Sequence, residues 1–246
     1  MSRMFEELDY QLTPIGALSL RRRRDLTTGD DIFEIKLGDE FLMSSLFTSS
    51  EIALGRLGVS ELAAGDYAKR DGFDIVVGGL GLGYTARAVL EHDAVGSLVV
   101  VDTLAAVIEW HETGLLPLGA GLSADPRCRF VHGDFFELSA SVGGFDAAHP
   151  GAKYDAILVD IDHSPEQLLD DGSAGFYLHE GLQRVASHLH PGGVFGLWSN
   201  DRPDAAFVAR LKEVFAVARG EPVMFHNPIQ NREAVQTVYL ARAHRG

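Results

Sequence analysis

Hydrophobic and polar positions change their pattern near residue 60 of this 246-residue chain. Before that point, short segments of mixed apolar and polar residues are separated by turn-forming stretches at 25–31 and 38–39. Such alternation, interrupted by Gly and Asp, predicts a small antiparallel sheet. The expected strands cover residues 17–24, 32–37 and 40–46, and a helix is expected from Ser50 towards Leu62.

Beyond residue 70, near-continuous apolar runs alternate with segments of helical pattern. Strands are expected at 73–77, 98–101, 129–132, 156–159, 194–198, 222–225 and 235–241, and helices at 85–91, 104–111, 176–189 and 204–215. Apolar strands that alternate with helices indicate a mostly parallel sheet covered on both faces. We therefore predict an α/β domain over residues 61–246, preceded by a small N-terminal β-domain over residues 1–60.

Composition restricts the functions that this fold can serve. The chain carries 21 Lys and Arg against 35 Asp and Glu, a net charge of −14, whereas nucleic-acid binding needs a basic face. A single cysteine, Cys128, excludes a disulfide framework and suits a reducing compartment. The acidic N-terminus has no secretory apolar region, and no apolar run is long enough to span a membrane. We expect a cytoplasmic protein that acts on a small molecule, without nucleic-acid or membrane partners.

A glycine-rich segment follows the first strand of the larger domain. Its four glycines are Gly78, Gly79, Gly81 and Gly83. Open α/β sheets bind ligands at the carboxyl ends of their strands, and glycines there let the backbone approach a ligand closely. The helix that follows offers free N–H groups to a negatively charged group. Residues 81–86 also satisfy the pattern G-x-G-x-x-[GA], which is a weak signal alone.

Polar residues end the next two strands of the expected sheet. Asp102, followed by Thr103, is placed to accept hydrogen bonds from two ribose hydroxyls; the alternative is that Asp102 caps the next helix. After the third strand, Asp134 can bind an adenine amino group, and Phe135 can stack on the base. Because an unpaired carboxylate at a strand end has no packing role, these acids predict a nucleoside-binding site.

The fourth strand ends in a cluster of ionisable residues, Asp160, Asp162 and His163. We predict that Asp160 orients the nucleophile or accepts its proton. His163 is a second candidate, because histidine titrates near neutral pH, and Asp162 is a partner for either. Glu51, near the start of the first helix, either closes over the acceptor or is a first-turn helix carboxylate.

This series of motifs resembles the class I S-adenosylmethionine-dependent transferases, and within them the spermidine synthase-like branch. The matching segments are 78–83 for the glycine loop, 100–102 and 107–108 for the ribose strand and helix, 133–134 for the adenine contact, 154–160 for the catalytic strand, and 176–177 and 191–193 for later landmarks. The resemblance covers roughly the whole chain. It implies a Rossmann-like class I methyltransferase fold with a seven-stranded sheet, and assembly as a homodimer. It also implies that S-adenosylmethionine or its decarboxylated form binds as cofactor at the residues named above, with Asp160 beside it.

Three departures from the synthase pattern fall on the part of the site that recognises amines. The acidic residue of the synthase loop G-G-G-D-G-G, which meets the ammonium group of the decarboxylated cofactor, is replaced here by Gly81 or Leu82. The Y-H-E-M motif becomes Ser-Ser-Glu-Ile at 49–52, and D-[ST]-[ST]-D-P becomes Asp-Ile-Asp-His-Ser-Pro at 160–165. We therefore predict methyl transfer to a small-molecule acceptor, with divergent aminopropyl transfer as the alternative.

Three other interpretations remain. Residues 160–163 resemble the D-A-D-K run of metal-dependent catechol-type O-methyltransferases, but the later Asn200-Asp201 pair has the reverse order, so we expect no metal. A nicotinamide-dependent dehydrogenase using residues 81–86 does not explain Asp134 and Asp160 together. A non-catalytic nucleoside-binding protein would keep the cofactor site without the reaction.

Overall fold

The N-terminal part of the chain is a four-stranded antiparallel sheet in the order β1-β2-β3-β4. A computed structural model describes residues 4–64, 72–161, 163–169 and 171–245. The strands are β1 (Phe5–Thr13), β2 (Gly16–Arg24), β3 (Asp31–Leu37) and β4 (Glu40–Ser44). The sequence pattern predicts the last three but not β1, because its many polar residues do not give the apolar pattern expected of a strand. Cross-strand ion pairs favour β1, since Arg22 of β2 lies 2.5 Å from Glu6.

The remaining strands form a seven-stranded sheet in the order β10-β11-β9-β8-β5-β6-β7. They are β5 (Phe73–Gly78), β6 (Val95–Asp102), β7 (Cys128–His132), β8 (Tyr154–Val159), β9 (Leu189–Ser199), β10 (Val217–Asn227) and β11 (Arg232–Arg242). Strands β5 to β9 run parallel, and the β10–β11 hairpin adds antiparallel to β9. The prediction of a mostly parallel seven-stranded sheet after a small antiparallel one is confirmed.

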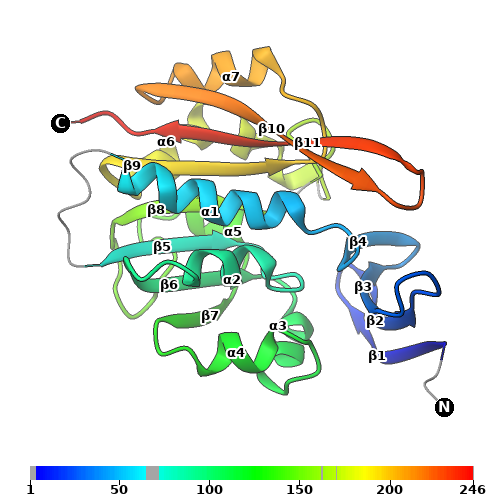
Figure 1. The fold of residues 1–246 in the computed structure, drawn as a ribbon. Helices are drawn as coiled ribbons and strands as arrows, with labels where there is room; N and C mark the ends of the chain where they lie inside the picture. Colours follow the sequence, from blue (N-terminus) through cyan, green and yellow to red (C-terminus); the bar gives the residue numbers. More distant parts are fainter. Residues whose placement is uncertain (1–3, 65–71, 162, 170, 246) are drawn as a thin grey trace.

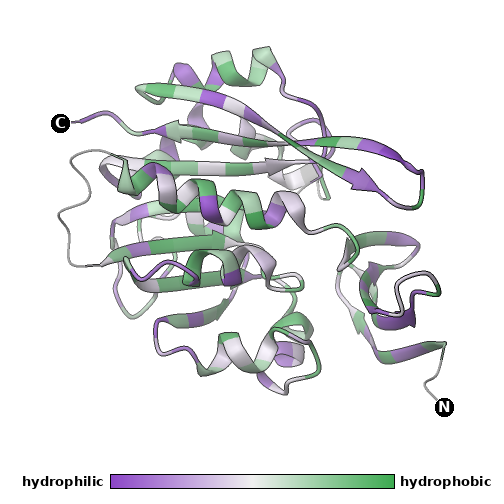
Figure 2. Cartoon of the chain, viewed as in Figure 1, coloured by the Kyte–Doolittle hydropathy of each residue, from purple (hydrophilic) through white to green (hydrophobic). Residues whose placement is uncertain are grey.

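Helices cover both faces of the large sheet (Figure 1). One face carries α1 (Ser49–Ala63), α2 (Tyr84–Leu90), α3 (Ala105–Glu112) and α4 (Gly119–Ala124). The other carries α5 (Phe135–Ala140), the 3-10 helix η2 (Asp171–Tyr177), α6 (His179–Ser187) and α7 (Ala205–Lys212). Apolar residues are concentrated in the central strands, whereas the tip of the β10–β11 hairpin is hydrophilic (Figure 2). Each face therefore has its own hydrophobic core.

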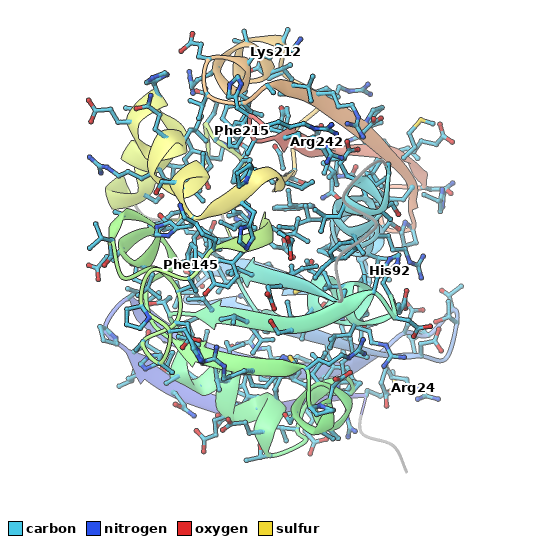
Figure 3. The ribbon with its side chains drawn as sticks, turned by 90° about the vertical axis from the view of Figure 1, so that its left-hand side faces the viewer. Arg24, His92, Phe145, Lys212, Phe215 and Arg242 are labelled. Atoms are coloured by element: carbon cyan, nitrogen blue, oxygen red, sulfur yellow. The ribbon has the colours of Figure 1, made fainter. Side chains whose placement is uncertain are left out.

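The two cores differ in what they join. The first includes Leu18, Leu20 and Ile35 of the small sheet, so this sheet packs against the core beneath α1 and α2. The second is rich in aromatic rings, and Figure 3 shows two of them, Phe145 and Phe215, inside the body of the molecule. Helix α1 crosses residue 60 and packs on β8 and β9 of the large sheet. The division of the chain at that residue stays a prediction.

The region after residue 170 shows where the sequence pattern misleads. The expected helix at 176–189 is present but shorter: α6 covers only His179–Ser187, η2 occupies the residues before it, and β9 already begins at Leu189. Leu189 pairs with Tyr154 of β8, so sheet pairing takes over before the Pro-Gly-Gly segment that seemed to end a helix. In the described part of the chain, no helix is long and apolar enough to cross a membrane.

Candidate functional site

The glycine-rich loop after β5 lies between β8 and the small sheet. Gly79 has a φ of +89°, and a Cβ atom there would overlap the backbone carbonyl of Asp160. Gly81 has a φ of +46°, and its Cβ position lies 2.7 Å from the sulfur of Met43. That sulfur also lies 3.1 Å from the Leu82 backbone nitrogen, which donates to it. The glycines are therefore required by close packing against the protein itself, which fixes the loop.

Asp102 connects this loop to the segment that starts α3. Its Oδ2 accepts a hydrogen bond from Leu80 N at 2.9 Å, and its Oδ1 accepts one from Leu104 N at 2.8 Å. Burial raises the pKa of this carboxyl. Thr103, the next residue, is exposed, and its carbonyl oxygen lies 3.2 Å from His132 Nε2. Asp102 does not cap α3, whose N-cap is Leu104 without a side-chain cap bond, and the Gly81 backbone N–H also bonds its carboxylate. The ribose contact of Asp102 stays a prediction.

Asp134 and Phe135 lie at the end of β7 but face different surroundings. Asp134 is the N-cap of α5, where its Oδ1 accepts from Phe136 N at 2.7 Å and from Glu137 N at 3.0 Å. Phe135 is only 3% exposed and stacks on Phe145 inside the second core. Phe135 therefore packs in the core, and its expected stacking on adenine is not supported.

Asp160 follows β8 and is held at the edge of the glycine loop. Its backbone nitrogen donates to the Gly78 carbonyl at 2.7 Å, and Thr85 Oγ1 donates to its Oδ2 at 2.6 Å. Burial raises the pKa of this carboxyl to about 6, and the Thr85 hydrogen bond opposes the shift only in part. At neutral pH, Asp160 is thus an ionised group that can accept a proton.

Glu51, from the first turn of α1, is the second carboxyl of this site. It is 7% exposed, and burial together with the negative charge of Asp160 raises its pKa to about 8. Ser50 Oγ lies 2.9 Å from Glu51 Oε2, and Thr85 Oγ1 lies 3.2 Å from the Glu51 carbonyl oxygen. Glu51 is thus a first-turn helix carboxylate, one of the two interpretations expected from the sequence, and it is buried because α1 packs against the large sheet.

The third candidate, His163, faces the small sheet. Its Nε2 lies 3.0 Å from Glu40 Oε1 of β4, and its carbonyl accepts from Asn200 N at 2.7 Å. Asp162 lies outside the described residues. The residues that are described contain no group of three or more His, Cys, Asp or Glu side chains that could hold a metal ion.

Comparison with known proteins decides the family. Residues 71–203, which include the glycine loop, Asp102, Asp134 and Asp160, match the sequence model of the spermine/spermidine synthase domain. The chain belongs to the spermine/spermidine synthase domain family. The branch suggested by the motifs is thereby confirmed.

Individual relatives agree with this family. Polyamine aminopropyltransferase 2 of Pseudomonas aeruginosa is 31% identical over 150 residues, which make up 58% of this chain and 40% of that relative. Spermidine synthase of Thermotoga maritima has a TM-score of 0.68 at 17% identity and covers 98% of this chain and 74% of its own. Human methyltransferase-like protein 13 has a TM-score of 0.56 at 23% identity, covering 77% and 82% of the two chains. The structural similarities show a shared fold.

The prediction of methyl transfer is wrong. The matching family model is that of the synthases, and the relative with 31% identity is an aminopropyltransferase. The prediction gave too much weight to the missing acid at Gly81 or Leu82. The fold brings another carboxyl to this edge, since Glu51 of α1 lies near Asp160 after β8. Because its pKa is raised to about 8, Glu51 is mainly protonated at neutral pH and does not replace the negative charge of the loop acid.

Sequence reasoning missed two residues that shape this site. Thr85 lies within an ordinary helical pattern, and no sequence signal marks its contact with Asp160. Ser50 precedes Glu51 in the segment compared with the Y-H-E-M motif, and that match is the signal that pointed to this region. Thr85 and Ser50 both contact residues that are distant in the sequence and become neighbours only in the folded chain.

Proposed function

We propose that this protein is a polyamine aminopropyltransferase, which transfers the aminopropyl group of decarboxylated S-adenosylmethionine to an amine of a polyamine. Membership in the synthase family and the similarity to an aminopropyltransferase support this activity. The observation that carries the proposal is the position of Asp160, a carboxyl group at the edge of the glycine loop whose raised pKa suits proton transfer near neutral pH.

The described residues fit the nucleoside part of such a cofactor. Both backbone bonds to Asp134 use Oδ1, which leaves Oδ2 for an adenine amino group. Asp102 already accepts from the backbone N–H groups of Leu80, Gly81 and Leu104, which leaves about one of its four lone-pair positions for a ribose hydroxyl. When bound, the cofactor supplies a carbon activated by the adjacent sulfonium. The expected residues Gly78, Gly79, Gly81, Gly83 and Thr103 border this space and stay predictions as ligand contacts.

Asp160 would prepare the amine for attack. A polyamine is cationic at neutral pH, so one ammonium must lose a proton before its nitrogen lone pair can form a bond to carbon. The ionised Asp160 takes that proton, and the electron pair of the broken C–S bond goes to sulfur. Thr85 suits both states of Asp160: its hydroxyl donates to the carboxylate at 2.6 Å, or turns to the Glu51 carbonyl at 3.2 Å once Asp160 is protonated.

The proposal is tested by incubating the protein with 1,4-diaminobutane and either decarboxylated or ordinary S-adenosylmethionine. We expect equal amounts of a thioether nucleoside and an aminopropylated amine, with the decarboxylated form only. Methylation of the diamine with ordinary S-adenosylmethionine would contradict the proposal. So would a protein that binds the decarboxylated cofactor but transfers nothing to a diamine or triamine. The cytoplasmic location, the homodimer, and the absence of metal, membrane and nucleic-acid partners stay predictions.

A further inference from the structure

Ser50 Oγ makes three polar contacts at the start of α1. Trp198 Nε1 of β9 donates to it at 2.7 Å. Gln236 Oε1 of β11 lies 2.6 Å away, and Glu51 Oε2 lies 2.9 Å away. Gln236 is oriented by its own amide nitrogen, which donates to Asn200 Oδ1 at 2.8 Å. Ser50 therefore faces a donor, a carbonyl acceptor and a carboxyl group at once.

The number of hydrogen atoms available for these contacts indicates the protonation state of Glu51. The Ser50 hydroxyl has one hydrogen, and the carbonyl oxygen of Gln236, at the shortest distance, can only accept it. The contact between Ser50 Oγ and Glu51 Oε2 then lacks a hydrogen unless Glu51 carries one. If Glu51 is protonated, it donates to Ser50, and all three contacts are hydrogen bonds. With the Gln236 carbonyl facing Ser50, this hydrogen-bond geometry favours a neutral Glu51.

The charges around Glu51 favour the same state. Two titratable groups face it: Asp160 from the end of β8, and Tyr84 at the start of α2. Burial and the proximity of Glu51 raise the pKa of Tyr84, so this phenol stays neutral. The contacts from β9 and β11 come from the uncharged Trp198 and Gln236. Among the described residues, no ion pair with a cation is found for Glu51, and hydrogen bonds from the Ser50 hydroxyl and from the backbone N–H groups of Ser50 and Glu51 offset the cost of a second negative charge only in part.

We propose that Glu51 is a positioning residue of the transfer site, a neutral carboxylic acid that leaves the only negative charge of the pair on Asp160. An ionised Glu51 would repel this charge and keep Asp160 protonated at neutral pH, where it could not accept a proton from the amine. The catalytic role of Asp160 rests on the proposed function. The protonation state of Glu51 does not, and it can be measured without any substrate.

The first experiment follows the side-chain carboxyl carbons of ¹³C-glutamate-labelled protein by NMR over pH 4–10. The Glu51 signal is assigned as the one missing in E51Q. We expect it to titrate near pH 8 in the wild type and at lower pH in D160N, where the neighbouring charge is gone. Titration near 4.5, the ordinary value for glutamate, would overturn the proposal whether or not the protein transfers aminopropyl groups. Should E51Q fail to fold, the response of the signal to D160N still identifies it.

The second experiment compares pH profiles of kcat/KM for aminopropyl transfer. Glutamine mimics a protonated glutamate, so we expect E51Q to keep activity within about threefold at pH 7 and to lose an inflection near pH 8. E51L, which cannot donate to Ser50, is expected to lose more than about tenfold. E180Q, at an exposed first-turn carboxylate of α6, is the matched control and should keep the wild-type profile. If E51Q is as inactive as E51L while the protein stays folded, Glu51 acts as a carboxylate and the proposal is wrong.

Discussion

Asp146 and the pair formed by Glu51 and Asp160 show how differently this protein treats its buried acids. Asp146 receives two hydrogen bonds from the Arg129 guanidinium, at 2.9 and 2.8 Å, and lies 2.7 Å from His149 Nδ1. These contacts hold the pKa of Asp146 well below its usual range. Burial instead raises the pKa of Glu51 and of Asp160. The region around Asp146 stabilises the ionised carboxylate, whereas the region around Glu51 and Asp160 destabilises it.

The comparison separates structural acids from acids of the site. Glu61 behaves like Asp146, because Arg219 and Arg242 both bind its carboxylate and lower its pKa. A cation-paired carboxylate supports folding, whereas a buried acid without a cation costs stability and is typical of functional sites. Substitutions in the two regions should therefore have opposite effects on activity and stability.

The largest effect is expected for D160N. Loss of a group that accepts a proton in the reaction should lower kcat for aminopropyl transfer by about 10²–10⁴-fold. Removing an ionised, poorly solvated carboxylate should also stabilise the fold at pH 8 by about 1 kcal/mol. Product formation and urea denaturation measure the two effects. A D160N protein that keeps wild-type kcat would remove Asp160 from the mechanism.

D146N should show the reverse pattern. Asparagine cannot form the ion pair with Arg129, which is half exposed, so we expect a loss of about 1–2 kcal/mol in the free energy of unfolding. The activity per folded molecule should stay at the wild-type level, because Asp146 lies in the loop between α5 and β8, away from the glycine loop. Urea denaturation and a transfer assay at low temperature test this. A stable but inactive D146N would contradict the division between the two regions.

The free energy of unfolding should depend on pH in two ranges, one set by Asp146 and the other by Glu51. The pKa of Asp146 is depressed from 3.8, so its contribution is present above about pH 4 and lost as the pH falls below it. The pKa of Glu51 is raised from 4.5 to about 8, so its contribution is complete below 4.5 and lost as the pH rises to 8. We expect D146N to weaken the pH dependence of the free energy of unfolding below about pH 4, and E51Q to weaken it between pH 4.5 and 8. Denaturation midpoints measured over pH test both expectations.

The smallest effect is expected for His163, which pairs with Glu40 between the two sheets. Because both side chains are partly exposed, H163A and E40A should each lower stability by less than about 1 kcal/mol. Neither should lower kcat by as much as a hundredfold, the lower range for the loss of an acid–base group. A double-mutant cycle on stability and kcat measures their coupling. A loss in H163A that matches D160N would make His163 the proton acceptor.

Local sequence signals were enough to predict the strands of the large sheet and their mostly parallel direction, but not their order in the sheet. Apolar runs such as 73–77 and 98–101, each followed by Gly or Asp, show both the strands and the edge at which ligands bind. Signals failed where long-range pairing decides local structure. Polar β1 is a strand because β2 pairs with it, and Leu189 belongs to β9 because it pairs with Tyr154 of β8.

The sequence by itself determined the fold class and placed Asp102, Asp134 and Asp160 at the ends of parallel strands, because hydrophobic periodicity depends on residues that are close together in the chain. It could not determine which acids are charged. That depends on neighbours from distant segments: Arg129 beside Asp146, and α1 with Glu51 beside Asp160. Burial and charge proximity are properties of the packed chain, so the division between structural acids and site acids was decided only by the tertiary structure.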